Sequence, residues 1–385
     1  MAHNAYQHRG GEDMVVDAEA AMLESYGHTV QHYRRHNDEL QKMSSLTAAA
    51  STLWSTRAAA EVERHCTQFR PDVIHVHNAF PLMSPSIYWA AARHRIPVVQ
   101  TLHNFRLLCP QAIFLRDGVI CEDCIGKLPW RAVTRQCYRQ SALQSAAVAG
   151  MLTLHRAVGS YQHRVTRFIT LNGFCRDKFI AGGLPAERLR IKPNFIPRGP
   201  LPQWTVRDGG LFVGRLSAEK GLDLLIQAKA MFPDAPLAVI GNGPLEHAAR
   251  AAFAAAYRGL QPLDAILEHM RTARYLIVPS ICYESSPRTI VEAFSCGLPV
   301  IASRLGSLPG IVREGITGLL FDPGDAADLA AKIRWAEAHP EQMRTMGKAA
   351  YQDYETHYTP ERNHQLLLEI YEDAINATQT KNHAA

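Results

Sequence analysis

The chain has 385 residues, of which 47% are hydrophobic, so it can bury two separate cores and predicts two domains. Its 41 basic and 36 acidic residues give a net charge of +5, too small a bias to indicate a nucleic-acid partner. No apolar run approaches the roughly 18 residues of a transmembrane helix, and the polar start is unlike a signal peptide. We therefore expect a cytosolic protein whose eight cysteines are reduced thiols or metal ligands.

The first half of the chain alternates short β-rich runs with helical stretches. Residues 72–77 and 96–101 read as strands separated by a helix over 87–93, and residues 18–26 and 46–66 read as helices. Strands and helices that alternate at this spacing predict a parallel sheet covered on both faces. Such sheets bind ligands beyond the carboxyl ends of their strands.

The amino-terminal stretch is unusual for such a domain, because a buried apolar strand normally leads into the first loop. Only the polar residues 1–8 precede the Gly10-Gly11 pair. Either the first strand is very short, or the natural start lies upstream of Met1. We favour the second interpretation, because the loss of a central strand would expose two sheet edges.

Four cysteines lie close together in an insert of about residues 105–140. The spacing is C-x11-C-x2-C-x12-C, formed by Cys109, Cys121, Cys124 and Cys137. A C-x2-C core with two flanking thiols predicts a structural, tetrahedral zinc site, whereas the irregular outer spacing leaves a set of reduced thiols as the alternative.

The segment from Ile125 to Arg176 contains no acidic residue. Its cations lie among apolar side chains such as Trp130, and solvated helical faces usually mix both signs of charge. This bias indicates a peripheral contact with an anionic membrane or a site for a lipid diphosphate, and the alternative is a basic face that only aids solubility. The cations of this segment are Lys127, Arg131, Arg135, Arg139, Arg156, Arg164, Arg167 and Arg176.

A proline-rich boundary over residues 192–202 separates the two halves, and a second alternating series runs from Leu211 to about His339. From Pro340 onward the pattern is helical and amphipathic, and we expect a polar, disordered tail after Thr378.

The most informative stretch of the second half covers residues 283–302. Ser286 suits the N-cap of a helix and Pro287 its first position, where the missing N–H would have had no partner. Gly297 ends this helix, and residues 298–302 read as a short buried strand.

Two carboxylates, Glu284 and Glu292, flank this helix start at a separation of eight residues. The backbone N–H groups of residues 288–290 would point outward at the positive end of the helix dipole, where phosphate binds well. One site would thus offer a diphosphate anchor and two acceptors for hydroxyl groups, which is what a nucleotide-sugar requires.

This pattern resembles the Glu-x7-Glu signature of the retaining glycosyltransferases of family 4, which have the α/β GT-B fold of two Rossmann-like domains with parallel sheets facing across a cleft. Residues 9–12 resemble the family's glycine loop and residues 98–104 its strand that ends in a histidine. Residues 212–221 resemble its strand-loop-helix with an Arg and a Lys, and residues 238–244 its next strand and Gly-rich turn. The resemblance runs from about Asn4 to Tyr358, and several motifs in the family's order make coincidence improbable.

The resemblance implies four catalytic residues. Arg215 and Lys220 would neutralise the departing diphosphate, His103 would lie beside the anomeric carbon, and Glu284 would contact the sugar hydroxyls. Glu292 would hold the ribose. The alternatives are a structural histidine, ordinary surface cations and a helix-face carboxylate. The remaining implied donor-binding residues are Gly10, Gly11, Gly214, Ser285, Ser286, Pro287, Arg288 and Thr289.

The GT-B resemblance also assigns the domains. An acceptor domain would cover residues 1–195, a nucleotide-sugar-binding domain residues 205–358, and a closing helix with a polar tail residues 359–385. The usual helix, strand and helix after the Gly-rich turn are compressed into residues 245–272, which departs from the family's pattern.

We interpret the chain as a retaining glycosyltransferase that moves a sugar from a nucleotide-diphosphate-sugar to a lipid-linked or polysaccharide acceptor, at the cytoplasmic face of the membrane, in bacterial-type surface polysaccharide or glycolipid synthesis. The sequence has no Asp-x-Asp motif on a suitable loop, so we expect no catalytic metal, and it has no plainly placed carboxylate nucleophile, so we expect front-face displacement. The alternatives are another GT-B enzyme, such as a sugar phosphorylase or a nucleotide-sugar epimerase, and a non-catalytic two-domain sugar-binding protein.

Overall fold

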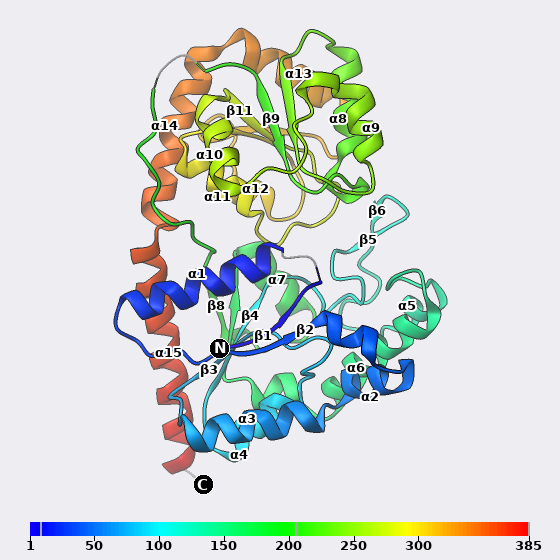
Figure 1. Ribbon diagram of the computed structural model, residues 1–385, viewed down its shortest axis with the longest axis vertical. Coiled ribbons are helices and arrows are strands. Elements are labelled where there is room, and N and C mark those ends of the chain that lie inside the picture. Colours follow the sequence, from blue (N-terminus) through cyan, green and yellow to red (C-terminus); the bar gives the residue numbers. More distant parts are fainter. Residues whose placement is uncertain (8–9, 205–206, 384–385) are drawn as a thin grey trace. The chain divides into compact units, whose positions relative to one another are not determined.

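The computed structural model describes residues 1–7, 10–204 and 207–383 (Figure 1). The chain divides into two compact units. The first unit comprises Met1–Ile113, Glu122–Asn194 and Asn363–Ala385, and the second comprises Phe114–Cys121 and Phe195–Arg362. Within the described ranges, no helix is both long enough and apolar enough to cross a membrane.

The first unit is built on a parallel sheet with the strand order β2-β1-β3-β4-β7-β8. Its strands are β1 (Ala2–Ala5), β2 (Tyr33–His36), β3 (Ile74–Asn78), β4 (Val98–Leu102), β7 (Arg167–Thr170) and β8 (Leu189–Ile191). Its helices are α1 (Gly11–Ser25), α2 (Ser45–Leu53), α3 (Thr56–Gln68), α4 (Ser86–Arg93), α5 (Trp130–Thr134), α6 (Ala142–Ala157), α7 (Gly173–Ala181) and most of α15 (Pro360–His383).

Strand β1 occupies an interior position of this sheet, paired in parallel with β2 and β3, although it has only four residues. Its polar side chains are buried with partners: His3 Nε2 lies 2.8 Å from Asp13 Oδ1, and Asn4 Nδ2 donates to Asn37 Oδ1 at 2.7 Å. Buried polar groups are tolerated when they are hydrogen-bonded. Residues 1–8 thus contain the very short first strand that was one of the two alternatives, and a natural start upstream of Met1 stays a prediction.

The two faces of the first sheet carry different chemistry. His75 on β3 bonds Thr101 on β4 at 2.8 Å and Tyr371 on α15 at 2.7 Å, so this polar face is covered by α15. Gln100 points to the opposite face, where it accepts a 2.9 Å bond from Tyr88 on α4. Because successive residues of a strand point to opposite faces, each strand supplies both layers.

The helix predicted over residues 46–66 is in fact two helices. Helix α2 ends at Leu53, and Ser55 begins α3 by accepting a 3.2 Å hydrogen bond from Ala58 N. A serine N-cap stabilises a new helix start, and this local signal outweighs the continuous alanine-rich pattern.

The second unit contains a parallel sheet with the order β10-β9-β11-β12-β13. These strands are β9 (Gly210–Val213), β10 (Leu237–Ile240), β11 (Tyr275–Val278), β12 (Val300–Ser303) and β13 (Gly318–Phe321), and the short hairpin β5 (Leu115–Arg116) and β6 (Val119–Ile120) groups with this unit. The helices are α8 (Leu222–Met231), α9 (Glu246–Phe253), α10 (Leu263–Thr272), α11 (Arg288–Ser295), α12 (Leu308–Ile311), α13 (Ala326–Ala338) and α14 (Pro340–His357).

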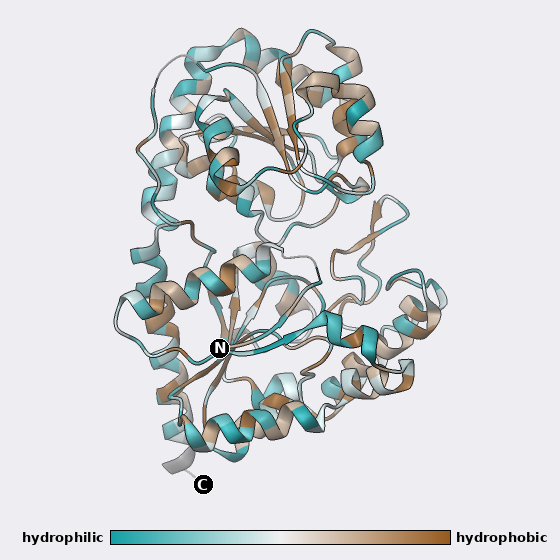
Figure 2. Cartoon of the chain, in the orientation of Figure 1, coloured by the Kyte–Doolittle hydropathy of each residue, from teal (hydrophilic) through white to brown (hydrophobic). Residues whose placement is uncertain are grey.

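Two apolar cores cover the two faces of the second sheet. Ile277 packs in one core with side chains of α8, α9 and α13, whereas its neighbours Leu276 and Val278 pack in the other with α10, α11, α12 and α14. Figure 2 shows brown along strands of the second unit, and its helices are brown in places and teal in others. Strands that are apolar on both faces are typical of parallel sheets buried between helices.

The structure tests two sequence predictions, one for the segment between α9 and α10 and one for the end of the chain. Between α9 and α10 the expected strand is reduced to one parallel bridge between Val239 and Tyr257, which agrees with the compression predicted over residues 245–272. Helix α15 runs on to His383, so the expectation of a disordered tail after Thr378 is wrong as far as the chain is described.

Candidate functional site

The second unit places the predicted Arg and Lys on the loop that follows β9. Gly214 N donates to Ile240 O at 3.1 Å, Arg215 is exposed, and Lys220 ends a short 3-10 turn (Ala218–Lys220) before α8. Gly221 has φ +73°, and a Cβ there would lie 1.8 Å from Pro279 O. Only glycine permits this close approach of the loop after β9 to the loop after β11.

The loop after β11 carries Glu284, which is 9% exposed. Its Oε1 accepts hydrogen bonds from Lys220 Nζ at 2.6 Å and from Ser280 Oγ at 2.7 Å, and its backbone oxygen accepts from Ser307 Oγ at 2.6 Å. Burial alone would lower the pKa of Lys220, but the Glu284 carboxylate outweighs it and the pKa is raised. Two predicted site residues are thus in direct contact at the carboxyl ends of neighbouring strands.

The helix after Glu284 begins one residue later than predicted. Helix α11 starts at Arg288 with Pro287 at the N-cap, and no side chain caps it, so the assignment of Ser286 as N-cap is wrong. Pro287 has the extended ψ of 110°, because it precedes the helix rather than opening it. The N–H of Ile290 donates to Pro287 O at 3.1 Å, so this group is not directed outward as expected. Ser285 and Thr289 flank this start and are half-buried.

Glu292 lies in the second turn of α11 and is buried at 5% exposure. Its Oε1 is 3.3 Å from Arg288 Nη2, one helical turn earlier. Burial raises the pKa of Glu292, and the Arg288 guanidinium only partly opposes this. Hydroxyl groups that donate to this carboxylate would favour its ionised form, so the environment of Glu292 suits a hydroxyl-bearing ligand.

In the first unit, the Gly10-Gly11 pair forms the start of α1. Gly10 is the N-cap, and its N–H donates to Asp13 Oδ2 at 2.8 Å, so that donor is already used within the loop. Glu12 accepts from Tyr6 Oη at 2.9 Å and from Asn104 Nδ2 at 2.7 Å. Arg9, which completes the predicted glycine motif, lies outside the described residues.

His103 follows β4 at the carboxyl end of the first sheet and is 7% exposed. Its Nε2 lies 2.9 Å from Nδ1 of His77 on the neighbouring strand β3. Burial lowers the pKa of both imidazoles, and that of His77 falls well below the ordinary value. A cavity of about 50 Å³ is lined by both histidines at this edge.

The structure adds residues that the sequence reasoning missed. Behind His77 lie Glu19 of α1, 0% exposed, and Lys192, 1% exposed, whose ammonium contacts Glu19 Oε1. A signal for them was available, because His75 and His77 interrupt an otherwise apolar strand and a buried polar strand position requires a partner.

Among the residues that the structure describes, the one group of three potential metal-ligand side chains whose ligand atoms lie within 4.8 Å of one another is Glu19, His75 and His77. Both ring nitrogens of His75 are occupied by Thr101 and Tyr371, and the Lys192 ammonium already neutralises Glu19. This donor set therefore does not fit a resident metal ion.

The four cysteine thiols of the insert are not gathered in this way. No three of them come within 4.8 Å of one another in the described ranges, and none forms a disulfide. Cys121 belongs to the second unit, whereas Cys109, Cys124 and Cys137 belong to the first. Zinc binding by these residues stays a prediction that metal analysis can test.

The acid-free segment places its cations in several different environments. Arg156 donates to Leu107 O at 2.5 Å, Arg164 stacks 4.1 Å from the centroid of Trp89, and Arg167 pairs with Asp373. These cations serve packing inside the first unit, and Arg131 and Arg135 both pair with Asp123, which precedes the segment. The basic bias is thus partly structural.

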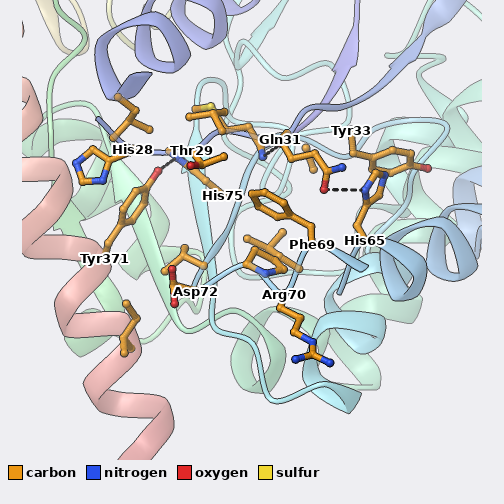
Figure 3. Close-up of a pocket in the computed structure, with 18 of the residues that line it drawn as sticks. His28, Thr29, Gln31, Tyr33, His65, Phe69, Arg70, Asp72, His75 and Tyr371 are labelled. Atoms are coloured by element: carbon orange, nitrogen blue, oxygen red, sulfur yellow. Dashed lines mark hydrogen bonds between the residues drawn. The ribbon is translucent and has the colours of Figure 1, made fainter. Parts of the chain in front are cut away.

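The larger cavity of the first unit, about 650 Å³, lies at the amino ends of β1 and β3 (Figure 3). His103, in contrast, follows the carboxyl end of β4. It is lined by Met1, Gln31 and His65 near the amino ends of β1 and β2, and by His75 and Tyr371. The amine of Met1 donates to Gln31 O, and Tyr33 N donates to Met1 O at 2.8 Å, so the pairing of β1 with β2 reaches the cavity wall. Ligands of parallel α/β sheets bind at the other end, so this cavity is not a candidate active site.

Comparison with known proteins agrees with this geometry. Residues 10–194 match the family described as "Glycosyl transferase 4-like domain", and residues 210–353 match "Glycosyl transferases group 1". The chain is 27% identical over 332 residues to "Sulfoquinovosyl transferase SQD2" of Arabidopsis thaliana, covering 83% of this chain and 60% of that relative. It is 31% identical over 308 residues to a "D-inositol 3-phosphate glycosyltransferase" of Geodermatophilus obscurus, covering 74% of this chain and 64% of the relative. The chain thus spans about 60% of the length of the first of these relatives.

Solved structures share the fold at low identity. The sucrose-phosphate synthase of Thermosynechococcus elongatus superposes with a TM-score of 0.71 at 17% identity, covering 97% of this chain and 96% of that one. Anabaena HepE in complex with UDP gives a TM-score of 0.66 at 17% identity, covering 96% and 98%. Two parallel α/β units, the two family matches and these neighbours together show that the chain has the GT-B fold and belongs to the group 1 glycosyltransferases of family 4.

Proposed function

We propose that this protein transfers a sugar from a nucleotide-diphosphate-sugar to an acceptor hydroxyl, with retention of configuration and without a catalytic metal. The observation that carries this proposal is the contact between Lys220 and Glu284, where a cation and a carboxylate meet at the carboxyl edge of the second sheet. Structural neighbours in complex with UDP and with UDP-glucose support a donor of this class.

The Lys220 ammonium is the group that receives the departing diphosphate. Its raised pKa keeps it charged, and without donor it is held by Glu284. Charge that develops on the leaving group is stabilised best by a cation already in position. Both side-chain bonds to Glu284 end on Oε1, so Oε2 serves as the acceptor for a hydroxyl of the transferred sugar.

Glu292 takes the ribose of the donor. Ribose hydroxyls donate hydrogen bonds that favour the ionised carboxylate, which burial disfavours in the unliganded protein. Binding at this residue therefore contributes mainly to donor affinity rather than to the chemical step.

Front-face displacement is supported by the partners of two acidic residues near the carboxyl edge of the first sheet. Glu12 accepts from Tyr6 and Asn104, and Asp13 accepts from Gly10 N and lies 2.8 Å from His3 Nε2. A carboxylate committed to several hydrogen bonds is a poor nucleophile. The acceptor hydroxyl then attacks from the side of the leaving phosphate, which takes its proton.

The acceptor we propose is a lipid-linked or surface glycan reached at an anionic membrane. Trp130 and Leu128 are 60% and 63% exposed, and the exposed Arg135 and Arg139 follow them. Apolar side chains beside cations suit peripheral docking, at about 1 kcal/mol per basic residue. One structural neighbour, named as a lipopolysaccharide outer core galactosyltransferase, supports an acceptor of this kind.

The donor is tested by thermal shift with a panel of UDP-, GDP- and ADP-sugars, each with and without EDTA, on wild type and on Glu292→Ala. We expect at least one nucleotide-sugar to raise the melting temperature of the wild type, independently of EDTA, and the variant to need a higher concentration. A melting temperature that no donor changes, or a shift abolished by EDTA, would contradict the proposal.

Membrane docking is tested by co-sedimentation with phosphatidylglycerol vesicles at low and high salt. The charge-reversed variant is Arg131→Glu, Arg135→Glu and Arg139→Glu, and its control reverses three exposed arginines elsewhere in the first unit, Arg57→Glu, Arg64→Glu and Arg93→Glu. We expect the first variant to lose binding and the control to keep it, because the two change the net charge equally. If both variants lost vesicle binding equally, net charge alone would explain the binding, and the segment would not be a specific membrane contact.

A further inference from the structure

A row of buried polar groups connects His103 to the interior of the first unit. His103 Nε2 lies 2.9 Å from His77 Nδ1, and His77 Nε2 lies 3.2 Å from Glu19 Oε2. The other oxygen of Glu19 contacts the Lys192 ammonium, which also donates to Asn363 Oδ1 at 3.0 Å. Glu19 lies on α1, His77 on β3 and Asn363 on α15, whereas His103 and Lys192 directly follow β4 and β8, so tertiary packing alone brings them together.

The charge states along this row follow from burial and pairing. Burial alone would raise the pKa of Glu19, but the Lys192 ammonium outweighs it and the pKa is lowered, so Glu19 is ionised. Burial lowers the pKa of His77 and of His103, so both rings are neutral near pH 7. Each imidazole therefore carries one proton, on one of its two nitrogens.

An ionised carboxylate carries no proton, so it favours a neighbouring N–H over a neighbouring lone pair, and this preference sets the tautomers along the row. Glu19 Oε2 and His77 Nε2 are buried and have no hydrogen-bond partner in the described residues, and the 3.2 Å between them is an electrostatic contact outside hydrogen-bond geometry. A proton on His77 Nε2 makes this 3.2 Å contact attractive, whereas its absence would set a lone pair against a buried carboxylate oxygen. With Nε2 protonated, His77 Nδ1 is an acceptor, and the contact with His103 requires the proton on His103 Nε2.

We propose that Glu19, held ionised by Lys192, fixes through His77 the tautomer of His103 with the proton on Nε2 and the lone pair on Nδ1. The inference rests on the proposed function in so far as His103 contacts the transferred sugar. In that role His103 Nδ1 accepts a hydrogen bond from a sugar hydroxyl and does not donate one. Glu19, His77 and Lys192 are then positioning residues, which act on the sugar only through His103.

The tautomer can be read directly by long-range proton–nitrogen correlation NMR on protein labelled with ¹⁵N-histidine. The signal of His103 is assigned by its loss in His103→Gln. In the wild type we expect a protonated Nε2 and an unprotonated Nδ1 for both His103 and His77. A protonated Nδ1 on either ring would overturn the proposal, and so would one equivalent of a metal ion bound through Glu19 and His77, because the metal would replace the proton.

The origin of the preference is tested with Glu19→Gln/Lys192→Met, which removes both buried charges together and avoids an unpaired ammonium. A glutamine amide both donates and accepts, so it no longer forces the proton onto His77 Nε2. We expect His103 to populate both tautomers and kcat to fall about tenfold, the effect of one hydrogen bond, with donor KM changed less than twofold. The control is Tyr371→Phe, which removes a buried hydrogen bond to His75 in the same cluster and should leave the tautomer of His103 unchanged.

The outcomes separate this inference from the proposed function. A single, unchanged tautomer in the double variant would refute the role of Glu19. If the tautomers were as expected but His103→Gln were fully active, the contact of His103 with the sugar would be refuted, and the effect of Glu19 on the tautomer of His103 would still hold.

Discussion

Removal of the Lys220 charge should lower the turnover rate strongly and the stability of the fold only slightly. Lys220→Met keeps the length of the side chain and removes the hydrogen bond to Glu284 at 2.6 Å. A hydrogen bond to a charged group contributes about 1.5–3 kcal/mol, but the lysine side chain is 34% exposed, and solvent screening reduces this to about 1 kcal/mol. In a domain of this size that corresponds to a melting temperature lower by about 2–4 °C.

The effect on turnover should be much larger than the effect on stability. Loss of one preorganised group that stabilises developing charge typically lowers kcat by about 10²–10³-fold. The assay is release of nucleoside diphosphate at saturating donor, with the donor taken from the thermal-shift panel. The donor KM should change little, since Glu292 is the residue assigned to ground-state binding.

A matched control lies near the carboxyl end of α8, the helix that follows the loop carrying Lys220. Lys229→Met removes an equal charge near the end of α8, where Lys229 donates to the backbone oxygen of Ala235 at 2.7 Å. Seven residues of helical rise place Lys229 about 10 Å along the axis from Leu222, the first residue of α8. We expect a similar change in melting temperature with normal kcat. If both Lys220→Met and Arg215→Ala turned over within twofold of wild type at saturating donor, the assignment of these cations to the leaving group would be wrong.

Four further outcomes can be measured. Glu292→Ala should raise the donor KM at least about tenfold with little change in kcat, and a normal KM in donor titrations would remove it from the ribose site. Burial lowers the pKa of His77 in the folded protein below its ordinary value of about 6.5. The neutral imidazole therefore contributes fully to stability at pH values above about 6.5, and this contribution is lost as the pH falls below that value. The melting temperature should therefore drop between pH 7.5 and 5.5, less steeply in His77→Gln, and equal slopes would contradict this. Metal analysis should find about one zinc per chain, lost in Cys121→Ser/Cys124→Ser, and folded, active protein without zinc would reject the site. An apolar extension of three β-branched residues before Met1 should raise the melting temperature by a few degrees, because it would continue β1 into the 650 Å³ cavity, and a Gly-Ser extension of equal length should not.

The sequence by itself determined the features that depend on short stretches of chain. Glu284 and Glu292 are joined by one loop and the start of one helix, so their spacing in the sequence was enough to predict that they belong to one site. Lys220 could be predicted in the same way from its place on the loop before α8. The alternation of apolar strands and helices determined two parallel sheets, because each strand buried on both faces reads as a continuous apolar run. The helix start was misplaced by one residue, since Ser286 and Pro287 both have the chemistry of a first turn.

Only the tertiary structure decided the features in which polar groups are buried together. Strand β1 was not recognised in the sequence because His3 and Asn4 are polar. Their burial depends on contacts with Asp13 and Asn37 from elsewhere in the fold. Glu19 and Lys192 are 173 residues apart and carry no local signal of their contact. A buried charge is stable only when a partner of opposite charge lies beside it. Glu19 meets Lys192 because α1 packs against the sheet, and residues close to either of them in the sequence do not determine this contact.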